Sequence, residues 1–233
     1  MKKLKKIAII PAAGKGERMQ SKIKKQYILL KGIPVLSHTI KAFNDCELID
    51  EIFLVIPKND HEYCKKKIIA PFNFKKIHLI CGGRQRQFSV FNGLKHIKEK
   101  KNYNKNSIVL IHDGVRPFIE KSIIKKAIKK ALKYSACIPA IKITDTIKKV
   151  SSDLRIKQTI KDTDLYLAQT PQAFKFELIL DAFNYAFKTS FCGRDEASIV
   201  EHFGHKVYII DGSSKNIKIT TPDDIKNLKT YFV

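Results

Sequence analysis

The stretch AAGKG at residues 12–16 is the first part of the sequence whose residue types could do chemistry. It follows the apolar run IAIIP, and Arg18, Lys22, Lys24 and Lys25 come soon after it. Small residues let a ligand approach the main chain, and glycine lets several N–H groups point at one place. The pattern indicates an anion site, in particular a phosphate site. An ordinary turn with solvated lysines is the alternative.

Two common phosphate-binding motifs do not fit this stretch. A Walker A loop requires the spacing GxxxxGK[ST], which the sequence lacks, and a dinucleotide fingerprint requires a third glycine where Met19 stands. The remaining GxG pair does not identify a ligand by itself. The crowding of positive charge around it is the stronger sign, and it favours a polyphosphate.

Asp113 is the second candidate, because it ends the apolar run of SIVLIHDGVRPF. A carboxylate at the tip of a buried strand is costly unless it is paired. Arg116 is one possible partner. A divalent cation is the other, since Mg²⁺ usually takes one or two carboxylates together with substrate phosphates. The sequence leaves both a loop clasp and a metal site open.

Lys218 in NIKITTPDDI is the third candidate. It interrupts the apolar alternation between Ile217 and Ile219, so it should project to the opposite face. A solvent-facing lysine is the simpler interpretation. Pro222 and the acids after it are typical of the first turn of a helix.

The elements that must position these residues alternate along the first half of the chain. We predict strands at Ile7–Pro11, Ile49–Pro57, Lys76–Cys81 and Ser107–Ile111, and helices at Pro34–Phe43, His61–Ile69, Gln87–Lys98 and Lys121–Tyr134. This alternation predicts an α/β fold with a mostly parallel sheet flanked by helices. Ligands of such sheets lie beyond the carboxyl ends of the strands, which is where Gly14, Gly82 and Asp113 occur.

The second half begins differently. Residues 137–160 contain two extended runs, Cys137–Val150 and Leu154–Ile160, around a polar turn, and predict a protruding β-hairpin arm within a single domain spanning 1–233. An exposed arm needs covering, which self-association would provide, although an excursion on a monomer is possible. The later elements are predicted helices at Lys175–Phe187 and Glu196–Phe203 and strands at Lys206–Asp211 and Ile217–Thr220.

Charge is the most prominent feature of the composition. The 233 residues include 45 Lys and Arg against 22 Asp and Glu, a formal net charge of +23. A nucleic-acid partner would explain such a charge. The lysines are spread along the whole chain, however, and in residues 121–134 they lie opposite an apolar face. Solvated helix faces are therefore the preferred interpretation, with no nucleic acid as a partner.

Other features indicate a cytoplasmic protein. No apolar run reaches the ~18 residues of a spanning helix. The apolar N-terminal run leads directly into the Gly-rich turn rather than to a cleavage site. The five cysteines lack a CxxC pair, which argues against a zinc site or a disulfide framework.

Seven short motifs give the sequence a family resemblance. PAAGKGERM, KKQY, GGRQRQFSV, HDGVRPF, AQTPQAF, DEAS and NIKIT occur in this order between Ile7 and about Asp224. The chain thereby resembles the 2-C-methyl-D-erythritol 4-phosphate cytidylyltransferases of isoprenoid precursor synthesis. The resemblance implies a Rossmann-like nucleotidyltransferase that dimerises through the arm. It also implies the reaction of CTP with a polyol phosphate, with Mg²⁺ required and pyrophosphate released.

The resemblance implies a role for each candidate. The residues expected to wrap the CTP phosphates are Ala12, Ala13, Gly14, Lys15 and Gly16. Those expected near the base are Gly82, Arg86 and Ser89. Those expected to act on the phosphates are Asp113 as the Mg²⁺ ligand, Arg116 beside the substrates, Arg18 and Lys25 at the transition state, and Lys218 on the incoming phosphate. Thr146 and Lys161 are expected to bind substrate.

Two departures from the family pattern concern the acceptor. Asp162 stands where the family has an arginine that reaches across the dimer, and we hypothesise that Lys161 compensates. Arg194 replaces a common threonine before Asp195. Ribitol-5-phosphate cytidylyltransferase is therefore the alternative, although residues 195–198 (DEAS) favour methylerythritol phosphate. A nucleic-acid-binding module and a non-catalytic nucleotide sensor are further alternatives.

Overall fold

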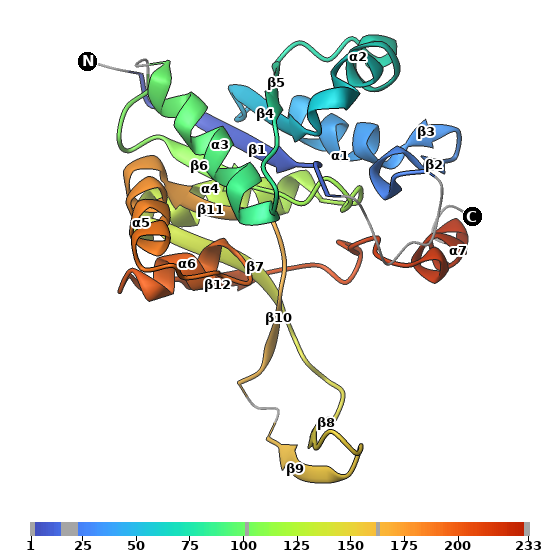
Figure 1. Cartoon of the computed structure of the whole chain (residues 1–233), viewed down its shortest axis with the longest axis vertical. Coiled ribbons are helices and arrows are strands. Elements are labelled where there is room, and N and C mark those ends of the chain that lie inside the picture. The colour runs from blue at the N-terminus through green and yellow to red at the C-terminus, as the bar shows by residue number, and fades with distance from the viewer. Residues whose placement is uncertain (1–2, 15–22, 101–102, 162–163, 231–233) are drawn as a thin grey trace.

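The computed structural model describes residues 3–14, 23–100, 103–161 and 164–230, with side chains up to residue 226. Strands and helices alternate through the first half, as predicted (Figure 1). In chain order these elements are β1 (Lys6–Pro11), β2 (Leu29–Leu30), β3 (Ile33–Pro34), α1 (Val35–Asn44), β4 (Glu51–Ile56), α2 (His61–Tyr63) with a π-helical continuation (Cys64–Ile69), β5 (Ile77–Cys81), α3 (Arg86–Glu99), β6 (Ile108–Ile111) and α4 (Lys121–Tyr134).

The second half completes the sheet and adds the arm. Its elements are β7 (Ala136–Lys142), β8 (Ile147–Val150), β9 (Ile156–Ile160), β10 (Tyr166–Ala168), β11 (Gln172–Lys175), α5 (Phe176–Lys188), α6 (Glu196–His202), β12 (Tyr208–Asp211) and α7 (Pro222–Thr230). No helix in the described part of the chain combines the length and the apolar character needed to span a membrane.

The central sheet is mixed and mostly parallel. Its order is β10-β7-β11-β6-β1-β4-β5, with β12 also paired to β7. The pairs β5–β4, β4–β1, β1–β6 and β7–β12 are parallel, whereas β11 is antiparallel to both β6 and β7. The parallel strands therefore end along one edge, and β1 and β6 end there side by side. This arrangement confirms the α/β sheet flanked by helices.

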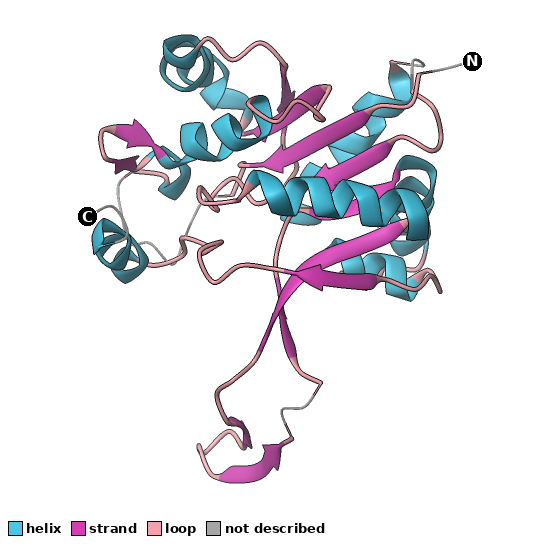
Figure 2. Cartoon of the chain, turned by 180° about the vertical axis from the view of Figure 1, so that it is seen from behind, coloured by secondary structure: helices cyan, strands magenta, loops and turns pink. Residues whose placement is uncertain are grey.

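Side-chain alternation along the strands divides the core into two layers. Ala8 and Ile10 of β1 face a cluster that includes Leu36 of α1, whereas Ile7 and Ile9 face one that includes Leu94 of α3. Helices α1 and α4 accordingly cover one face of the sheet, and α3, α5 and α6 cover the other, as Figure 2 shows from behind. Burial on both sides is the reason that these strands are almost entirely apolar.

Helix α4 illustrates the charge pattern. Its buried residues, which recur at helical spacing, are Ile123, Ile124, Ala127, Ile128 and Ala131. The lysines lie on the other face, and the helix ends at Tyr134, before Ser135, whose backbone is left-handed with φ of 71°. The helix predicted at Lys121–Tyr134 is confirmed with its solvated lysine face.

Three predictions about the second half were wrong in part. Residues 136–142 form β7 in the main sheet, because β10, β11 and β12 all pair with them. The two extended runs predicted at 137–150 and 154–160 did not include β10 or β11, and neither strand was predicted. Residues 217–220 are not a strand, since their main chain shows one backbone bond to another segment, from the Ile219 N–H to the Val115 carbonyl at 2.9 Å.

The projecting hairpin consists of β8 and β9. These strands pair antiparallel from Ile147 opposite Ile160 to Val150 opposite Ile156, and they hang well clear of the main sheet (Figure 1). Large apolar side chains on this arm are exposed, with Leu154 at 81% and Ile156 at 63%. The hairpin therefore presents apolar surface that the single chain does not cover.

Candidate nucleotide-binding site

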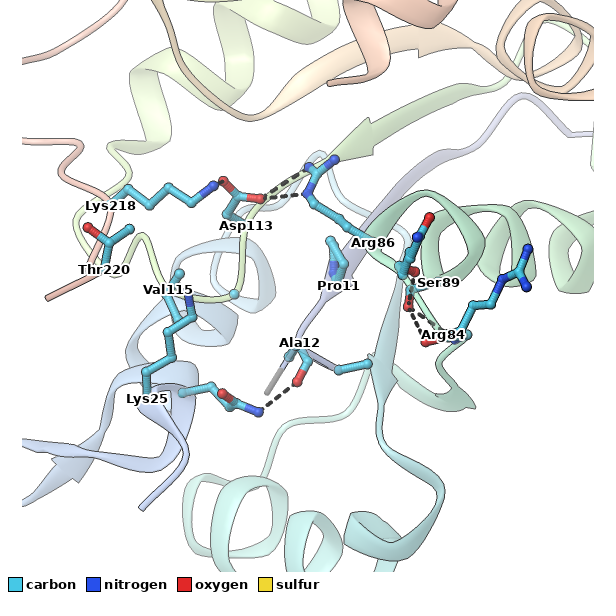
Figure 3. A pocket seen from close by; sticks show the side chains of 16 residues that line it. Pro11, Ala12, Lys25, Arg84, Arg86, Ser89, Asp113, Val115, Lys218 and Thr220 are labelled. Carbon is cyan, nitrogen blue, oxygen red and sulfur yellow. Dashed lines mark hydrogen bonds and ion pairs between the residues drawn. The ribbon is translucent and has the colours of Figure 1, made fainter. Parts of the chain in front are cut away.

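A pocket of 530 Å³ opens at the carboxyl edge of the parallel strands (Figure 3). Its wall starts at Pro11, the last residue of β1, and includes Gly83 after β5 and Asp113 after β6. The predicted site residues that line it are Ala12, Ala13, Gly14, Lys25, Arg86, Ser89, Asp113 and Lys218. Residues far apart in the sequence thus meet where the fold class places ligands.

The turn after β1 is held from both sides. The Ala12 N–H donates to the Val55 carbonyl at 2.7 Å, and the Ala12 carbonyl accepts from Gln26 Nε2 at 2.8 Å. Gly14 is exposed, and a Cβ there would meet nothing within 4 Å. The main chain therefore lies open to the pocket, while Lys15, Gly16, Arg18 and Lys22 are outside the described residues.

Gly82 makes the close packing behind this turn possible. A Cβ on Gly82 would lie 2.3 Å from the Cβ of Ala13, a distance that real side chains do not adopt. Ser89 fixes the next residues, because its Oγ accepts from the Gly83 N–H at 3.1 Å and donates to the Gln85 carbonyl at 3.1 Å. The structure gives these two residues a role in shaping the wall. Arg84 instead lies over the ring of Phe88 and points away from Asp113 (Figure 3).

Lys25 reaches the pocket because its neighbours are anchored elsewhere. Lys24 Nζ donates to both carboxylate oxygens of Asp60 at 2.7 Å, and the Tyr27 hydroxyl donates to the same carboxylate at 2.7 Å. Gln26 is buried beneath the turn. The short 3₁₀ turn Lys25–Tyr27 therefore directs Lys25 to the pocket side. The sequence did not indicate Asp60 as an anchor.

Asp113 is the centre of charge in the pocket. Burial raises the pKa of this carboxyl, but Arg86, Lys218 and Arg116 outweigh burial and hold the pKa well below its usual range. Lys218 Nζ lies 2.8 Å from Oδ2, Arg86 Nη2 lies 3.1 Å from Oδ1 and Arg116 Nε lies 3.5 Å from Oδ2. The predicted partner Arg116 is confirmed, but it is the most distant of these three cations.

The segment around residue 218 is attached to the loop after β6. Arg116 Nη1 donates to the Asn216 carbonyl at 2.7 Å, and Asn216 Nδ2 donates to the Thr170 carbonyl at 2.7 Å. Burial of Asn216 and Ile219 holds the segment down. Lys218 therefore projects to the opposite face, as its spacing predicted, and that face is the pocket rather than solvent.

His112 and Thr170 support Asp113 from below, and sequence reasoning missed both. The Asp113 N–H donates to Thr170 Oγ1 at 3.2 Å, and that hydroxyl lies 3.0 Å from His112 Nδ1. His112 Nε2 lies 3.1 Å from the Arg116 carbonyl. Complete burial lowers the pKa of His112 to about 4, so this histidine is neutral at pH 7. A histidine at the end of an apolar run was the signal that could have identified it.

The structure does not bring every candidate to the pocket. Thr146 and Lys161 immediately flank the Ile147–Ile160 pair of the arm, and both are exposed rather than part of the pocket lining. Arg116 and Gly82 lie behind the lining residues. Asp162 is outside the described residues.

The residues that line the pocket fit a divalent cation that is held partly by the protein and partly by the phosphates of a bound ligand. Among the described residues, no group of three or more His, Cys, Asp or Glu side chains forms a metal cage. Asp113 is the carboxylate in the described lining of the pocket, and Mg²⁺ commonly takes one or two carboxylates with phosphate oxygens. A single carboxylate beside open N–H groups and cations matches that arrangement. Direct ligation at Oδ2 requires Lys218 to move.

The fold and the pocket together define a nucleotide-binding α/β protein of the nucleotidyltransferase class. Comparison with known proteins identifies the family. Residues 6–232 match the family model described as 2-C-methyl-D-erythritol 4-phosphate cytidylyltransferase. The protein of that name from Clostridium novyi is 44% identical over 97% of this chain and 99% of its own, and that from Syntrophus aciditrophicus is 46% identical over 96% and 94%.

Solved structures agree with the sequence relatives. The 4-diphosphocytidyl-2C-methyl-D-erythritol synthase of Anaerococcus prevotii matches with a TM-score of 0.83 and 35% identity, covering 98% of this chain and 96% of that one. The 2-C-methyl-D-erythritol 4-phosphate cytidylyltransferase of Francisella tularensis matches at 0.81 and 32%, covering 97% and 99%. The chain belongs to the 2-C-methyl-D-erythritol 4-phosphate cytidylyltransferase family and has its cytidylyltransferase activity in isoprenoid synthesis. The ribitol alternative is not favoured.

Proposed function

We propose that the chain transfers CMP from CTP to 2-C-methyl-D-erythritol 4-phosphate, giving 4-diphosphocytidyl-2-C-methyl-D-erythritol and pyrophosphate. The main support is the pocket, in which Arg86 and Lys218 pair with Asp113 and Lys25 lines the wall beside an open main-chain turn. An oxygen of the acceptor phosphate attacks the α-phosphorus in line, one P–O bond forms, and the bond to pyrophosphate breaks. This chemistry needs positioning and charge neutralisation rather than a covalent enzyme intermediate.

The side chains divide the work by position. The turn at residues 12–16 wraps the CTP phosphates. Its donors there are the N–H groups of Ala13 and Gly14, because the Ala12 N–H is bound to the Val55 carbonyl, and Lys15 and Gly16 follow. Gly82, Arg86 and Ser89 shape the wall near the base. Lys25, with Arg18, stabilises the charge that develops on the α-phosphoryl oxygens. In Figure 3 Lys218 lies beside Asp113, across the pocket from Arg84 and Ser89, which suits contact with the acceptor phosphate.

In this proposal Mg²⁺ is the divalent cation, and Asp113 is its protein ligand. When bound, such an ion neutralises phosphate oxygens and favours pyrophosphate as a leaving group. Asp113 remains ionised at any physiological pH because neighbouring cations lower its pKa. Arg86 holds the carboxylate at Oδ1 and Arg116 holds it at Oδ2, where Lys218 is the closer partner.

The arm completes the acceptor site in a homodimer. Thr146 and Lys161 flank the Ile147–Ile160 pair of the arm and lie outside the pocket of their own chain, so a second copy is needed to bring them to a substrate. Lys161 supplies the positive charge that the family obtains from an arginine. The exposed apolar residues of the arm, including Leu154 and Ile156, provide surface for association.

Analytical ultracentrifugation tests this assembly. We expect a dimer for the unmodified protein and a shift to monomer for Ile156→Asp. Leu132→Asp is the matched control, since Leu132 is an exposed apolar residue on α4, away from the arm. A monomeric unmodified protein that is fully active would contradict the proposed role of the arm.

Pyrophosphate release tests the reaction itself. The protein is incubated with CTP and MgCl₂, and with either 2-C-methyl-D-erythritol 4-phosphate or ribitol 5-phosphate. We expect release with the first acceptor and not with the second. Binding of CTP without release would indicate a sensor, and strongly salt-dependent retention on DNA or RNA would indicate a nucleic-acid-binding module.

We also place the protein in the cytoplasm. All five cysteines are free, and three of them, Cys46, Cys64 and Cys137, are buried thiols. Unpaired cysteines are usual in a reducing compartment.

A further inference from the structure

The DEAS motif at residues 195–198 has no part in the chemistry described above, yet it places a carboxylate behind the pocket. Glu196 lies in the first turn of α6 and is only 1% exposed. It is not one of the residues that line the pocket. A carboxylate buried this deeply needs a charged partner, because an unpaired one is strongly destabilising.

Arg86 is that partner, and it forms a two-pronged pair with Glu196. Its Nη1 donates to Oε1 at 2.5 Å, and its Nη2 donates to Oε2 at 3.0 Å. The other edge of the same guanidinium faces Asp113, with Nε donating to Oδ1 at 3.1 Å and Nη2 at 3.1 Å from the same oxygen. One arginine thus joins a buried carboxylate to the carboxylate of the pocket.

These contacts occupy most of the donors of Arg86. A guanidinium has five N–H groups, and the contacts to Glu196 and Asp113 use about four of them. Little capacity remains for a ligand. The planar fork is well suited to such a bridge, since it can bind carboxylates along two edges at once.

The start of α6 is rigid enough to act as a support. Asp195 caps the helix by accepting from the Ser198 N–H at 2.9 Å, and Gln172 Oε1 accepts from the Ala197 N–H at 2.8 Å. Gln87, the residue after Arg86, binds the same segment, since its Oε1 accepts from the Gly193 N–H at 3.1 Å. The first turn of α3 is therefore attached at two consecutive residues, with Arg86 bound to α6 and Gln87 to the loop that precedes it.

We propose that Glu196 is a positioning residue, which holds the Arg86 guanidinium so that it fixes Oδ1 of Asp113 and leaves the Oδ2 edge facing Lys218 and the ligands. The proposal rests on the proposed function, in which Asp113 serves the transfer of CMP. Because Arg86 pairs with Glu196 as well as with Asp113, only part of its positive charge acts on Asp113. Without Glu196, the whole charge of Arg86 would act on Asp113, and the carboxylate would be less available to a metal ion.

Side-chain NMR of the ligand-free protein tests the geometry without any reaction. The chain has only six arginines, so the Nε–H signals in a ¹⁵N spectrum are few. We expect a protected Nε–H signal of Arg86, assigned with Arg86→Lys, that moves and loses protection in Glu196→Gln. Glu201→Gln, an exposed acid on the same helix, should leave it unchanged. An unchanged Arg86 signal in Glu196→Gln would overturn the proposal.

Kinetics then separate positioning from general support of the fold. We expect Glu196→Gln to lower kcat about 10- to 100-fold, the usual cost of losing a residue that orients a ligand, with a smaller change in KM for CTP. In an Asp113→Asn background the same change should cost little more, because its effect passes through Asp113. Full additivity of the two losses, or an unchanged kcat in Glu196→Gln, would overturn it.

Two further results keep the test decisive. If Glu196→Gln does not fold, Glu196→Asp replaces it, since that variant keeps the charge but shortens the reach to Arg86. Partial activity in Glu196→Asp then supports positioning, and full activity contradicts it. Absence of pyrophosphate release in the unmodified protein would reject the proposed function instead, and the NMR result would still decide whether Glu196 orients Arg86.

Discussion

Two carboxylates at opposite edges of the sheet are each surrounded by positive charge. Asp113 follows β6 at the carboxyl edge and faces Arg86, Arg116 and Lys218. Glu51 begins β4 at the amino edge. Its neighbours there are Lys5, His78 at 3.0 Å, Lys100 at 3.8 Å and the Tyr103 hydroxyl at 2.6 Å.

Asp113 and Glu51 differ in the structure that adjoins each carboxylate. Asp113 adjoins the open turn at Ala12–Gly14 and forms part of the pocket wall, whereas Glu51 lies outside that wall and is covered by Tyr103. The parallel strands point their carboxyl ends at Asp113 and away from Glu51. Cations around a carboxylate therefore do not by themselves define a ligand site. The position of Asp113 at the carboxyl edge of the sheet and the exposed main chain beside it define the site.

The largest expected effect comes from removing the charge of each carboxylate. Asp113→Asn should lower turnover by about 10³-fold, the upper range for loss of a single electrostatic contact in an active site. Glu51→Gln should leave turnover unchanged, because Glu51 contacts no part of the pocket. Pyrophosphate release from CTP measures both. A large loss in Glu51→Gln with intact folding would remove the distinction between the two clusters.

A lysine at each edge gives the next comparison. Lys25→Ala should lower kcat by about 10²-fold, or roughly 3 kcal/mol of barrier, with a smaller change in CTP affinity, since this cation acts on charge that develops in the transition state. Lys100→Ala, beside Glu51, is the control and should retain its rate. Steady-state kinetics and CTP titration separate the two parameters. Retained turnover in Lys25→Ala would exclude Lys25 from the transition state.

Acid stability should depend on Glu51. Burial raises the pKa of Glu51, but hydrogen bonds from Lys5 and Tyr103 outweigh burial and leave the pKa below its ordinary value of 4.5. Its contribution to stability is therefore complete above pH 4.5 and is lost as the pH falls through the lower folded value. Glu51→Gln should flatten the decrease of the unfolding free energy below pH 4.5, by at most about 1.4 kcal/mol per pH unit.

Urea unfolding at several pH values measures this slope. Glu201→Gln, an exposed acid on α6, serves as the control and should retain the slope of the unmodified protein. Identical slopes in the unmodified protein and Glu51→Gln would show that the cations around Glu51 do not stabilise its charge.

The smallest effect concerns the helix that carries Glu196. Asp195 caps α6 in a reciprocal arrangement with Ser198. Asp195→Ala should cost about 1 kcal/mol of unfolding free energy, the typical value of an N-cap. Urea unfolding measures it, with Ser122→Ala on α4 as a control, since Ser122 caps no helix. A loss of several kcal/mol would mean that the start of α6 supports far more of the fold than its cap.

The local pattern predicted most of the first half of the fold. Strands such as Ile7–Pro11 and helices such as Lys121–Tyr134 followed from apolar spacing, because each of them buries a regular face. The second half was harder to predict. β10 and β11 are short, with three and four residues, and they exist because β7 offers a partner to β10 while β6 and β7 together flank β11. Residues 217–220 were predicted as a strand, but their main chain forms a single backbone hydrogen bond to another segment.

By itself, the sequence determined the α/β alternation, the open turn at residues 12–14 and the concentration of chemistry at strand ends. These features depend on near neighbours in the chain, which side-chain size and periodicity describe. Only the tertiary structure decided that Arg86 joins Asp113 to Glu196 and that Lys218 turns from solvent to the pocket. Those contacts link residues between 27 and 110 positions apart, so the packing of the helices and loops around the sheet selects them.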